Sequence, residues 1–256
     1  MHGYYGGVRL IKASIKRFAD YCRETGVALD DRNFTLQYPT TIPRLVGLGG
    51  SSAIITAALR ALMRFYDVEI PRTIQPTLIL SVEKDELQIP AGLQDRVAQV
   101  YQGVTYMDFD QAIMDRQGFG HYEPLTPSQL PPLYVAIAED QAEPTERFHG
   151  TAQVLYNQGK REVVDAINEI AHLASQARQA LLNGHPEELS ALMNHNFDLR
   201  ASVFRIKPEH RAMVEAARQV GVSAKFAGSG AASSEPTNRR NSWPGCARPS
   251  RPADAR

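Results

Sequence analysis

The sequence predicts an α+β fold, because helical and strand patterns both occur in each half of the chain. Residues 8–22 carry apolar side chains at steps of three and four positions, which places them on one face of a helix. Residues 34–38 alternate apolar and polar side chains, as in a half-buried strand. Hydrophobic residues make up 43% of the chain, a share that allows a sizeable buried core.

The first half is predicted to continue with a largely buried helix over residues 53–66. Its narrow polar stripe consists of Thr56, Arg60 and Arg64, which we expect to face solvent, with phosphate binding by the two arginines as the alternative. Residues 77–83 are ambiguous between strand and helix. Residues 93–101 are predicted to be helical and residues 104–109 to form a strand.

The second half is predicted to begin after a stretch that contains Pro124, Pro127, Pro131 and Pro132. We therefore expect one domain over residues 1–130 and a second over residues 131–232. Within the second, residues 133–138 and 223–227 are expected strands, and apolar spacing predicts a helix over residues 163–181. Two further helices are expected to begin at Pro186 and Pro208, because proline is favoured at the first position of a helix.

Residues 233–256 form a tail of different composition, with five Arg, four Pro and two acidic residues. The tail contains no Val, Ile, Leu, Met, Phe or Tyr, so we expect it to be disordered. It carries a charge of +3, and the rest of the chain therefore carries −3, since the total is zero. Such an abrupt change of composition is typical of a segment unrelated to the fold.

The charge balance and the apolar runs exclude several classes of protein. Lys plus Arg equal Asp plus Glu at 28 each, which argues against a general nucleic-acid or anionic-membrane binder. No apolar run is long enough for a membrane-spanning helix, and the first residues lack the pattern of a signal peptide. Two cysteines are too few for a disulfide framework, so we expect a cytoplasmic protein.

The most informative segment is a glycine- and serine-rich loop that runs into the buried helix. Glycine allows positive φ and close approach of a ligand, and the helix start supplies free N–H groups and a positive dipole end. These features predict phosphate binding. The loop lacks the lysine of a Walker A motif and the spacing of a dinucleotide-binding motif. A tight turn that caps a buried helix is the alternative. Its residues are Gly47, Leu48, Gly49, Gly50, Ser51, Ser52 and Ala53.

Three segments in order resemble signatures of the GHMP small-molecule kinases. Pro43 and the loop that follows it are similar to the second signature of that family. Residues 92–96, Gly-Leu-Gln-Asp-Arg, resemble the catalytic segment of its sugar-kinase branch. Residues 225–231, Lys-Phe-Ala-Gly-Ser-Gly-Ala, resemble the third, glycine-rich signature. Residues 4–10, 42–44, 91–99 and 196–200 also resemble the glucuronokinase group.

This resemblance implies a two-domain fold and a reaction. The N-terminal part would be like ribosomal protein S5 domain 2 and the C-terminal part like a ferredoxin-type α/β domain. The chain would be a kinase that uses ATP and Mg²⁺ to phosphorylate the anomeric hydroxyl of D-glucuronate, giving glucuronate 1-phosphate. Galacturonate, fucose and heptose are alternative substrates. We expect neither a nucleic acid nor a membrane as partner, and the sequence does not predict an oligomeric state.

The resemblance also assigns roles to individual residues. Asp95 would be the catalytic carboxylate that faces the sugar hydroxyl. Glu83 would be the Mg²⁺ carboxylate, together with Ser51 or Ser52, and hard oxygen ligands suit this ion. Outside the family context, Glu83 would be a surface charge and Asp95 a salt-bridged helix residue.

Two further sets of residues are predicted to lie at the same site. Gly228, Ser229 and Gly230 would close on the phosphate side of the cleft. Asn196 and Arg200, one helical turn apart, would either face the sugar or lie on a helix surface. The seven histidines show no spacing typical of metal ligands.

The chain departs from the family pattern at both ends. The resemblance begins near Gly3, after the point where the family has its first signature, and it stops near Ala231. We therefore expect a fold that is incomplete at both ends. A non-catalytic remnant of the fold is the alternative to an active kinase.

Overall fold

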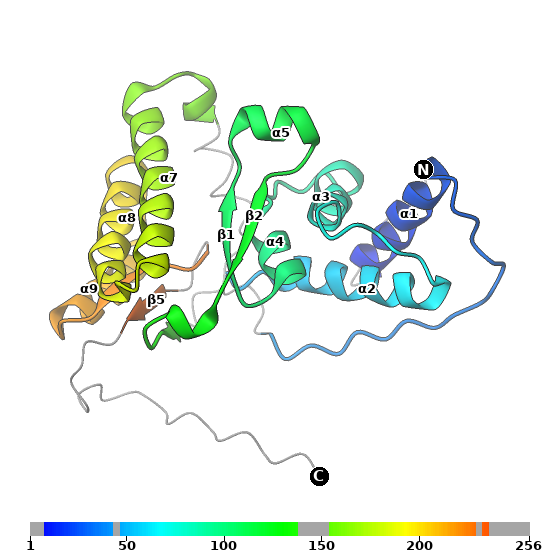
Figure 1. The fold of residues 1–256 in the computed structure, drawn as a ribbon, viewed down its shortest axis with the longest axis horizontal. Helices are drawn as coiled ribbons and strands as arrows, with labels where there is room; N and C mark the ends of the chain where they lie inside the picture. Colours follow the sequence, from blue (N-terminus) through cyan, green and yellow to red (C-terminus); the bar gives the residue numbers. More distant parts are fainter. Residues whose placement is uncertain (1–7, 43–46, 138–153, 229–231, 236–256) are drawn as a thin grey trace, which may run out of the picture.

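The computed structural model describes residues 8–42, 47–137, 154–228 and 232–235 of the chain. Helices and strands are both present, which confirms the predicted α+β class. Two groups of helices lie on either side of a long β-hairpin (Figure 1). Every site residue discussed below is positioned by one of these two helical groups.

The first helical group builds the larger core. Its elements are α1 (Arg9–Glu24), α2 (Gly50–Tyr66), α3 (Gln75–Ser81), the π-helical turn η2 (Val82–Glu86) and α4 (Gln94–Tyr101). α1 buries Phe18 and Cys22 against Ile55 and Leu62 of α2 and Ile79 of α3, all between 0% and 2% exposed. This packing holds the start of α2, η2 and the start of α4 close together.

The hairpin joins the two groups. Strands β1 (Val104–Asp108) and β2 (His121–Leu125) pair antiparallel around the short helix α5 (Gln111–Gln117). On the side of the second group, Arg178 donates to Glu123 with Nε–Oε2 and Nη2–Oε1 distances of 2.7 and 3.0 Å. The hydroxyl groups of Tyr106 and Ser175 also lie 3.0 Å apart.

The second group combines helices with a small sheet. Its elements are η3 (Pro127–Gln129), β3 (Tyr134–Ala136), α7 (Arg161–Leu182), η5 (Pro186–Glu188), α8 (Leu189–Val203), α9 (Pro208–Gln219), β4 (Ser223–Phe226) and β5 (Ala232–Glu235). The sheet order is β3-β5-β4, and both pairings are antiparallel. A second core forms where α8, α9 and β4 meet, around Phe197, Val214 and Phe226.

Most sequence predictions of elements are confirmed. The expected helices appear as α1, α2, α4, α7 and α9, and Pro208 is the first residue of α9. The ambiguous residues 77–83 are helical and lie in α3 and η2. Pro186 opens the single 3₁₀ turn η5, and α8 follows directly. The bounds of strands β1, β3 and β4 differ from the predicted bounds by at most two residues.

The predicted strand over residues 34–38 is wrong. The burial of these residues alternates as predicted, because Phe34, Leu36 and Tyr38 are half-buried and the residues between them are exposed. In the described part of the chain, however, no neighbouring segment pairs with them, and they belong to neither a helix nor a strand. Alternation predicts which side chains turn inward, but a strand also needs a partner for its backbone.

The predicted disordered tail begins too early. Residues 233–235 belong to β5, which pairs with both β3 and β4. Backbone hydrogen bonds of a sheet ladder form between peptide groups, so they do not require the apolar residues that this segment lacks. Residues 236–256 lie outside the described residues.

Among the described helices, none is both long enough and apolar enough to cross a membrane.

Candidate active site

The glycine-serine loop leads directly into the first turn of α2. Gly47 and Gly49 both have positive φ, at 77° and 64°, and Gly49 caps the helix. The first helical hydrogen bond runs from the Ala53 N–H to the Gly49 carbonyl, with an N–O distance of 3.0 Å. The N–H groups of Gly50, Ser51 and Ser52 precede that bond, so α2 offers them no carbonyl acceptor. This helix start can therefore receive an anion.

Gly49 lies against the predicted catalytic carboxylate. A β-carbon at position 49 would lie 3.2 Å from Asp95 Oδ2 and 3.0 Å from Gln99 Nε2. Both distances are tighter than ordinary van der Waals contact, and the positive φ adds strain for any other residue. The glycine thus allows the loop to approach α4 closely, and the structure brings Asp95 to the loop.

Asp95 is open to solvent although it lies beside this packed loop. It occupies the first turn of α4, and its side chain is 45% exposed. The nearest cation is the neighbouring Arg96, whose Nη1 lies 3.7 Å from Asp95 Oδ2. An exposed carboxylate oxygen beside an anion-binding loop is in a position to meet a second ligand at the same site.

Glu83 is buried beside Ser51, contrary to the alternative that it is a surface charge. Its side chain is 3% exposed, and the Ser51 hydroxyl donates to Oε1 at an O–O distance of 2.8 Å. The other oxygen, Oε2, accepts from Arg96 Nη2 in an ion pair, and the Arg96 side chain is 6% exposed. The π-helical turn η2 carries Glu83 to this position, and such turns occur frequently at functional sites.

The two serines of the loop have different surroundings. Ser51 is exposed and bonds to Glu83. Ser52 is fully buried, and its hydroxyl donates to the Gly49 carbonyl at 2.9 Å. Gln99 Nε2 donates to the Ser52 hydroxyl and to the same Gly49 carbonyl, at 2.9 and 3.0 Å. Ser51 is therefore the serine that can reach a ligand, while Ser52 supports the loop.

Thr56 was predicted to face solvent, and that prediction is wrong. The residue is 3% exposed, and its hydroxyl donates to Gln99 Oε1 at 3.1 Å. Arg60 and Arg64, the other members of the predicted polar stripe, are exposed as predicted. The stripe is buried at its first position because α4 packs there.

The third glycine-rich segment meets the loop from the other half of the chain. A β-carbon at Gly228 would lie 2.5 Å from the Gly47 carbonyl oxygen, a distance at which something must shift. The absence of a side chain at Gly228 therefore allows the segment that follows β4 to approach the loop. Ser229 and Gly230 lie outside the described residues.

The two residues predicted to contact the sugar lie on α8. Asn196 is half-buried, and its side chain makes no hydrogen bond with any described residue. Arg200 is half-buried, and its guanidinium carbon lies 5.5 Å from the centre of the Phe226 ring. In the described part of the chain, neither residue forms a hydrogen bond or ion pair with Asp95.

The residues at the loop fit a magnesium ion that is shared with bound phosphates. Glu83 and Ser51 supply hard oxygen donors within 2.8 Å of each other. Among the described residues, no group of three His, Cys, Asp or Glu side chains could hold a metal. One carboxylate and one hydroxyl are typical of Mg²⁺, which is usually bound by few protein ligands together with substrate phosphates.

Sequence reasoning missed the two residues that hold this arrangement together. Arg96 neutralises Glu83 and also donates from Nη1 to the Gly92 carbonyl at 2.8 Å. Gln99 links α4 to the loop and to Ser52. Both lie on α4 within the segment that resembles the sugar-kinase branch, which is the one signal that could have found them.

Comparisons with known proteins agree with this geometry. Residues 9–103 match the family described as the GHMP kinases N terminal domain. The chain is 48% identical over 236 residues to probable glucuronokinase 2 of Arabidopsis thaliana, and 45% identical over 235 residues to glucuronokinase 1 of the same plant. Each match covers 90% of this chain and 64% of the relative, so the chain spans less than two thirds of their length.

A solved structure shares the fold at much lower identity. Phosphomevalonate kinase of Streptococcus pneumoniae, in complex with phosphomevalonate and AMPPNP, aligns with a TM-score of 0.64 at 13% identity. That alignment covers 89% of this chain and 73% of the other. These comparisons show that residues 9–103 of this chain match the N-terminal domain of the GHMP kinases, and that most of the chain is similar in sequence to two plant glucuronokinases.

Proposed function

We propose that this chain is an ATP-dependent sugar kinase that transfers the γ-phosphoryl group to the anomeric hydroxyl of D-glucuronate. The observation that carries the proposal is the meeting of Asp95 with the loop at Gly49, where a β-carbon would lie 3.2 Å from the carboxylate. An anion-binding helix start and an exposed carboxylate are the two parts that phosphoryl transfer needs side by side. Identity of 48% to a probable glucuronokinase supports the choice of sugar.

The loop would hold the nucleotide phosphates. The N–H groups of Gly50, Ser51 and Ser52 would donate to phosphate oxygens, and the dipole of α2 would stabilise their negative charge. Gly228, against the Gly47 carbonyl, would let the segment that follows β4 close over the same phosphates. The complex of the Streptococcus phosphomevalonate kinase with AMPPNP shows that a protein of this fold takes an ATP analogue, which supports ATP as the cosubstrate.

Asp95 would accept the proton of the sugar hydroxyl. The hydroxyl oxygen attacks the γ-phosphorus, the bond from that phosphorus to the ADP oxygen breaks, and the hydroxyl proton passes to a carboxylate oxygen of Asp95. Arg96 would keep the Asp95 side chain oriented. The Arg96 guanidinium group is itself held by its ion pair with buried Glu83.

Glu83 and Ser51 would hold Mg²⁺ together with the phosphates. When bound, this ion neutralises negative charge on the phosphate oxygens. Of the two serines, Ser51 is the proposed ligand because it is exposed and bonded to Glu83, whereas Ser52 is fully buried. Asn196 and Arg200 remain proposed sugar contacts on α8.

We also propose a domain boundary near residue 130. The hairpin β1–β2 packs on α4, while β3 pairs with β5 of the C-terminal sheet. The active site would then lie where the two domains meet, since Gly47 belongs to one and Gly228 to the other.

The experiment compares Asp95→Asn with the unchanged chain and with Asp115→Asn, a control on an exposed carboxylate of α5. Release of ADP and formation of the sugar phosphate are measured with ATP, Mg²⁺ and D-glucuronate. Loss of a general base lowers turnover by about 10²- to 10⁴-fold, so Asp95→Asn is expected to lose activity in that range. Asp115→Asn should match the unchanged chain.

Two results would count against the proposal. Equal turnover of Asp95→Asn and the unchanged chain would remove Asp95 as the base. Turnover in neither protein, with ATP still bound, would favour a non-catalytic member of the fold. Running galacturonate, fucose and a heptose beside glucuronate tests the choice of sugar.

A further inference from the structure

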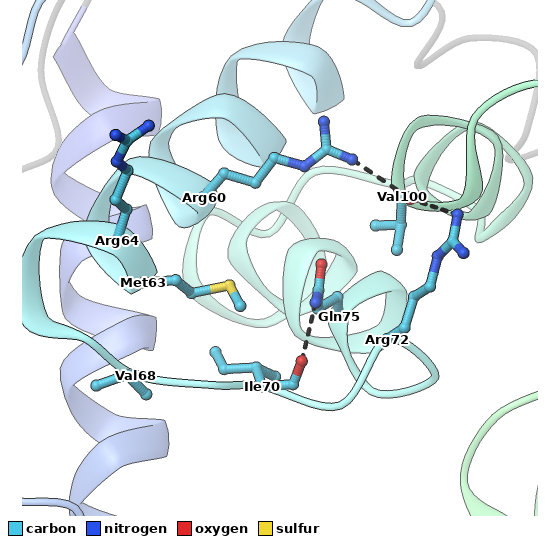
Figure 2. Close-up of a pocket in the computed structure, with 8 residues that line it drawn as sticks. All are labelled: Arg60, Met63, Arg64, Val68, Ile70, Arg72, Gln75 and Val100. Carbon is cyan, nitrogen blue, oxygen red and sulfur yellow. Dashed lines mark hydrogen bonds between the residues drawn. The ribbon is translucent and has the colours of Figure 1, made fainter.

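A second concave surface lies at the C-terminal half of α2, whereas the phosphate loop precedes the N-terminal end of this helix. It has a volume of about 450 Å³ and opens between α2, the start of α3 and the end of α4 (Figure 2). Its floor includes Met63, Ile70 and Val100, and three arginines line it, namely Arg60, Arg64 and Arg72. We call it the arginine pocket. Its size falls in the range of small-molecule sites.

Two of the arginines converge on one peptide group. Arg60 Nη2 donates to the carbonyl oxygens of Gln99 and Val100 at 2.8 and 3.3 Å. Arg72 Nη2 donates to the Val100 carbonyl at 3.4 Å and also to Tyr101. Figure 2 shows both guanidinium groups reaching Val100 from opposite sides. Two positive charges are therefore held close together at the C-terminal end of α4.

Most N–H donors of these arginines make no hydrogen bond with a described residue. A guanidinium group carries five N–H donors, and Arg60 and Arg72 use only Nη2 in hydrogen bonds with described residues. The Arg64 side chain makes no hydrogen bond in the described part of the chain, and all three arginines are exposed residues. In the described part of the chain, no carboxylate forms an ion pair with any of the three arginines, although the Arg72 guanidinium carbon lies 4.4 Å from the centre of the Tyr101 ring. The pocket thus keeps three positive charges that no described carboxylate neutralises.

The arginine pocket is separate from the phosphate loop. Arg60 lies ten residues after Gly50 on the same helix, which corresponds to about 15 Å at the rise of an α-helix. Arg64 lies one turn further. A ligand at the loop therefore does not fill the pocket, and the catalytic proposal makes no use of these arginines.

We propose that the arginine pocket is an accessory site for an organic phosphate. Planar guanidinium groups with free donors bind phosphate oxygens in pairs, which favours this anion over a simple halide. The apolar floor of Met63, Ile70 and Val100 would contact the carbon body of the ligand. Nucleotides and sugar phosphates share this chemistry, and the experiment separates them. The inference does not depend on the proposed kinase activity.

The competing explanation is that Arg60 and Arg72 only cap the carbonyl groups at the end of α4. Cations near a helix C-terminus stabilise it through the dipole and through hydrogen bonds. Arg64 separates the two explanations, because it bonds to no described carbonyl and yet lines the pocket. Capping predicts that Arg64 has no effect on anion binding, whereas an accessory site predicts that it has one.

The test measures binding of pyrophosphate, AMP and glucose 1-phosphate to the 256-residue chain by isothermal titration calorimetry. Arg64→Gln should weaken binding of pyrophosphate about tenfold, the effect of one charge-assisted hydrogen-bond pair. Arg72→Lys keeps the charge but loses the fork geometry, and about a threefold loss is expected. Arg161→Gln, on α7 with a side chain 93% exposed, is the matched control and should bind as the unchanged chain does.

Each outcome decides for or against the site. Weaker binding of pyrophosphate by both pocket variants, with unchanged thermal midpoints, supports the site. The ratio of the AMP affinity to the glucose 1-phosphate affinity then tells whether the pocket prefers a nucleotide or a sugar phosphate. Binding that is equal in all four proteins overturns it, because pyrophosphate at the glycine loop would be insensitive to these substitutions. Absence of binding in the unchanged chain also overturns it.

Discussion

The two halves of the molecule bury charge in opposite ways. Glu83 and Arg96 in the N-terminal half are 3% and 6% exposed, and their opposite charges are paired. Arg200 and Lys225 in the C-terminal half have the same sign. Burial lowers the pKa of both, and together with the charge of Arg200 it brings the pKa of Lys225 to about 8.

This difference shows which half holds its geometry without a ligand. A buried pair of opposite charges with further hydrogen bonds keeps its own arrangement, and its loss leaves a single charge in a low dielectric. Two like charges near each other instead oppose folding. Lys225 lies in β4, which ends at Phe226, two residues before Gly228 beside the phosphate loop. The N-terminal half thus holds its charges in a neutral pair, whereas burial in the C-terminal half disfavours the charged form of Lys225.

Removal of Arg96 should give the largest effect on stability. Arg96→Met leaves Glu83 buried without its cation, and breaking a buried ion pair in this way costs about 3–5 kcal/mol. Urea unfolding followed by circular dichroism measures the change. Arg161→Met is the matched control, since its exposed pair with Asp165 should contribute less than about 1 kcal/mol. A loss for Arg96→Met as small as that of the control would mean that the pair is not buried in solution.

The contact between the halves can be tested at Gly228. Gly228→Ala places a methyl group 2.5 Å from the Gly47 carbonyl oxygen, so the backbone must shift, at a cost of about 1–3 kcal/mol. Activity should fall with it, because the two glycine segments would separate. Gly92→Ala is the control, since a β-carbon there meets nothing within 4 Å. A neutral Gly228→Ala would show that the halves do not pack at this point.

The local parts of this site were predictable from sequence, and the contacts between its parts were not. The loop at Gly49 follows from glycine, serine and an apolar run, all adjacent in the chain. The burial of Glu83 depends on the π-helical turn and on Arg96 of another helix, which no periodicity reveals. The approach of Gly228 to Gly47 joins distant segments, so only a resemblance to known signatures indicated it.

The same limit explains the errors in the fold. Residues 34–38 have the inward and outward pattern of a strand, but pairing depends on a neighbour that the pattern does not contain. Residues 233–235 lack apolar side chains, yet β3 and β4 supply backbone partners. In both cases the deciding interaction is a hydrogen bond between distant peptide groups, and side-chain composition does not report it.

The smallest effect concerns Lys225 and is visible only through pH. Its pKa is about 8 in the folded chain and 10.5 for the ordinary side chain, so between these values the unfolded chain binds more protons. The free energy of unfolding therefore rises with pH over that range. Below pH 8 the full cost of burying the charged Lys225 side chain is present. Lys225→Met removes the penalty and should raise the free energy of unfolding at pH 7 by about 1 kcal/mol, since the residue is only half-buried.

The measurement is the difference in unfolding free energy between the unchanged chain and Lys225→Met from pH 7 to pH 10. The gain should shrink as pH rises above 8. Burial also raises the pKa of Cys22 and Tyr101, but these groups are the same in both proteins and cancel in the difference. Lys12→Met, on the exposed face of α1, should give a difference that does not change with pH. A flat difference for Lys225→Met as well would mean that Lys225 is hydrated, and the contrast between the two halves would then rest on Arg200 alone.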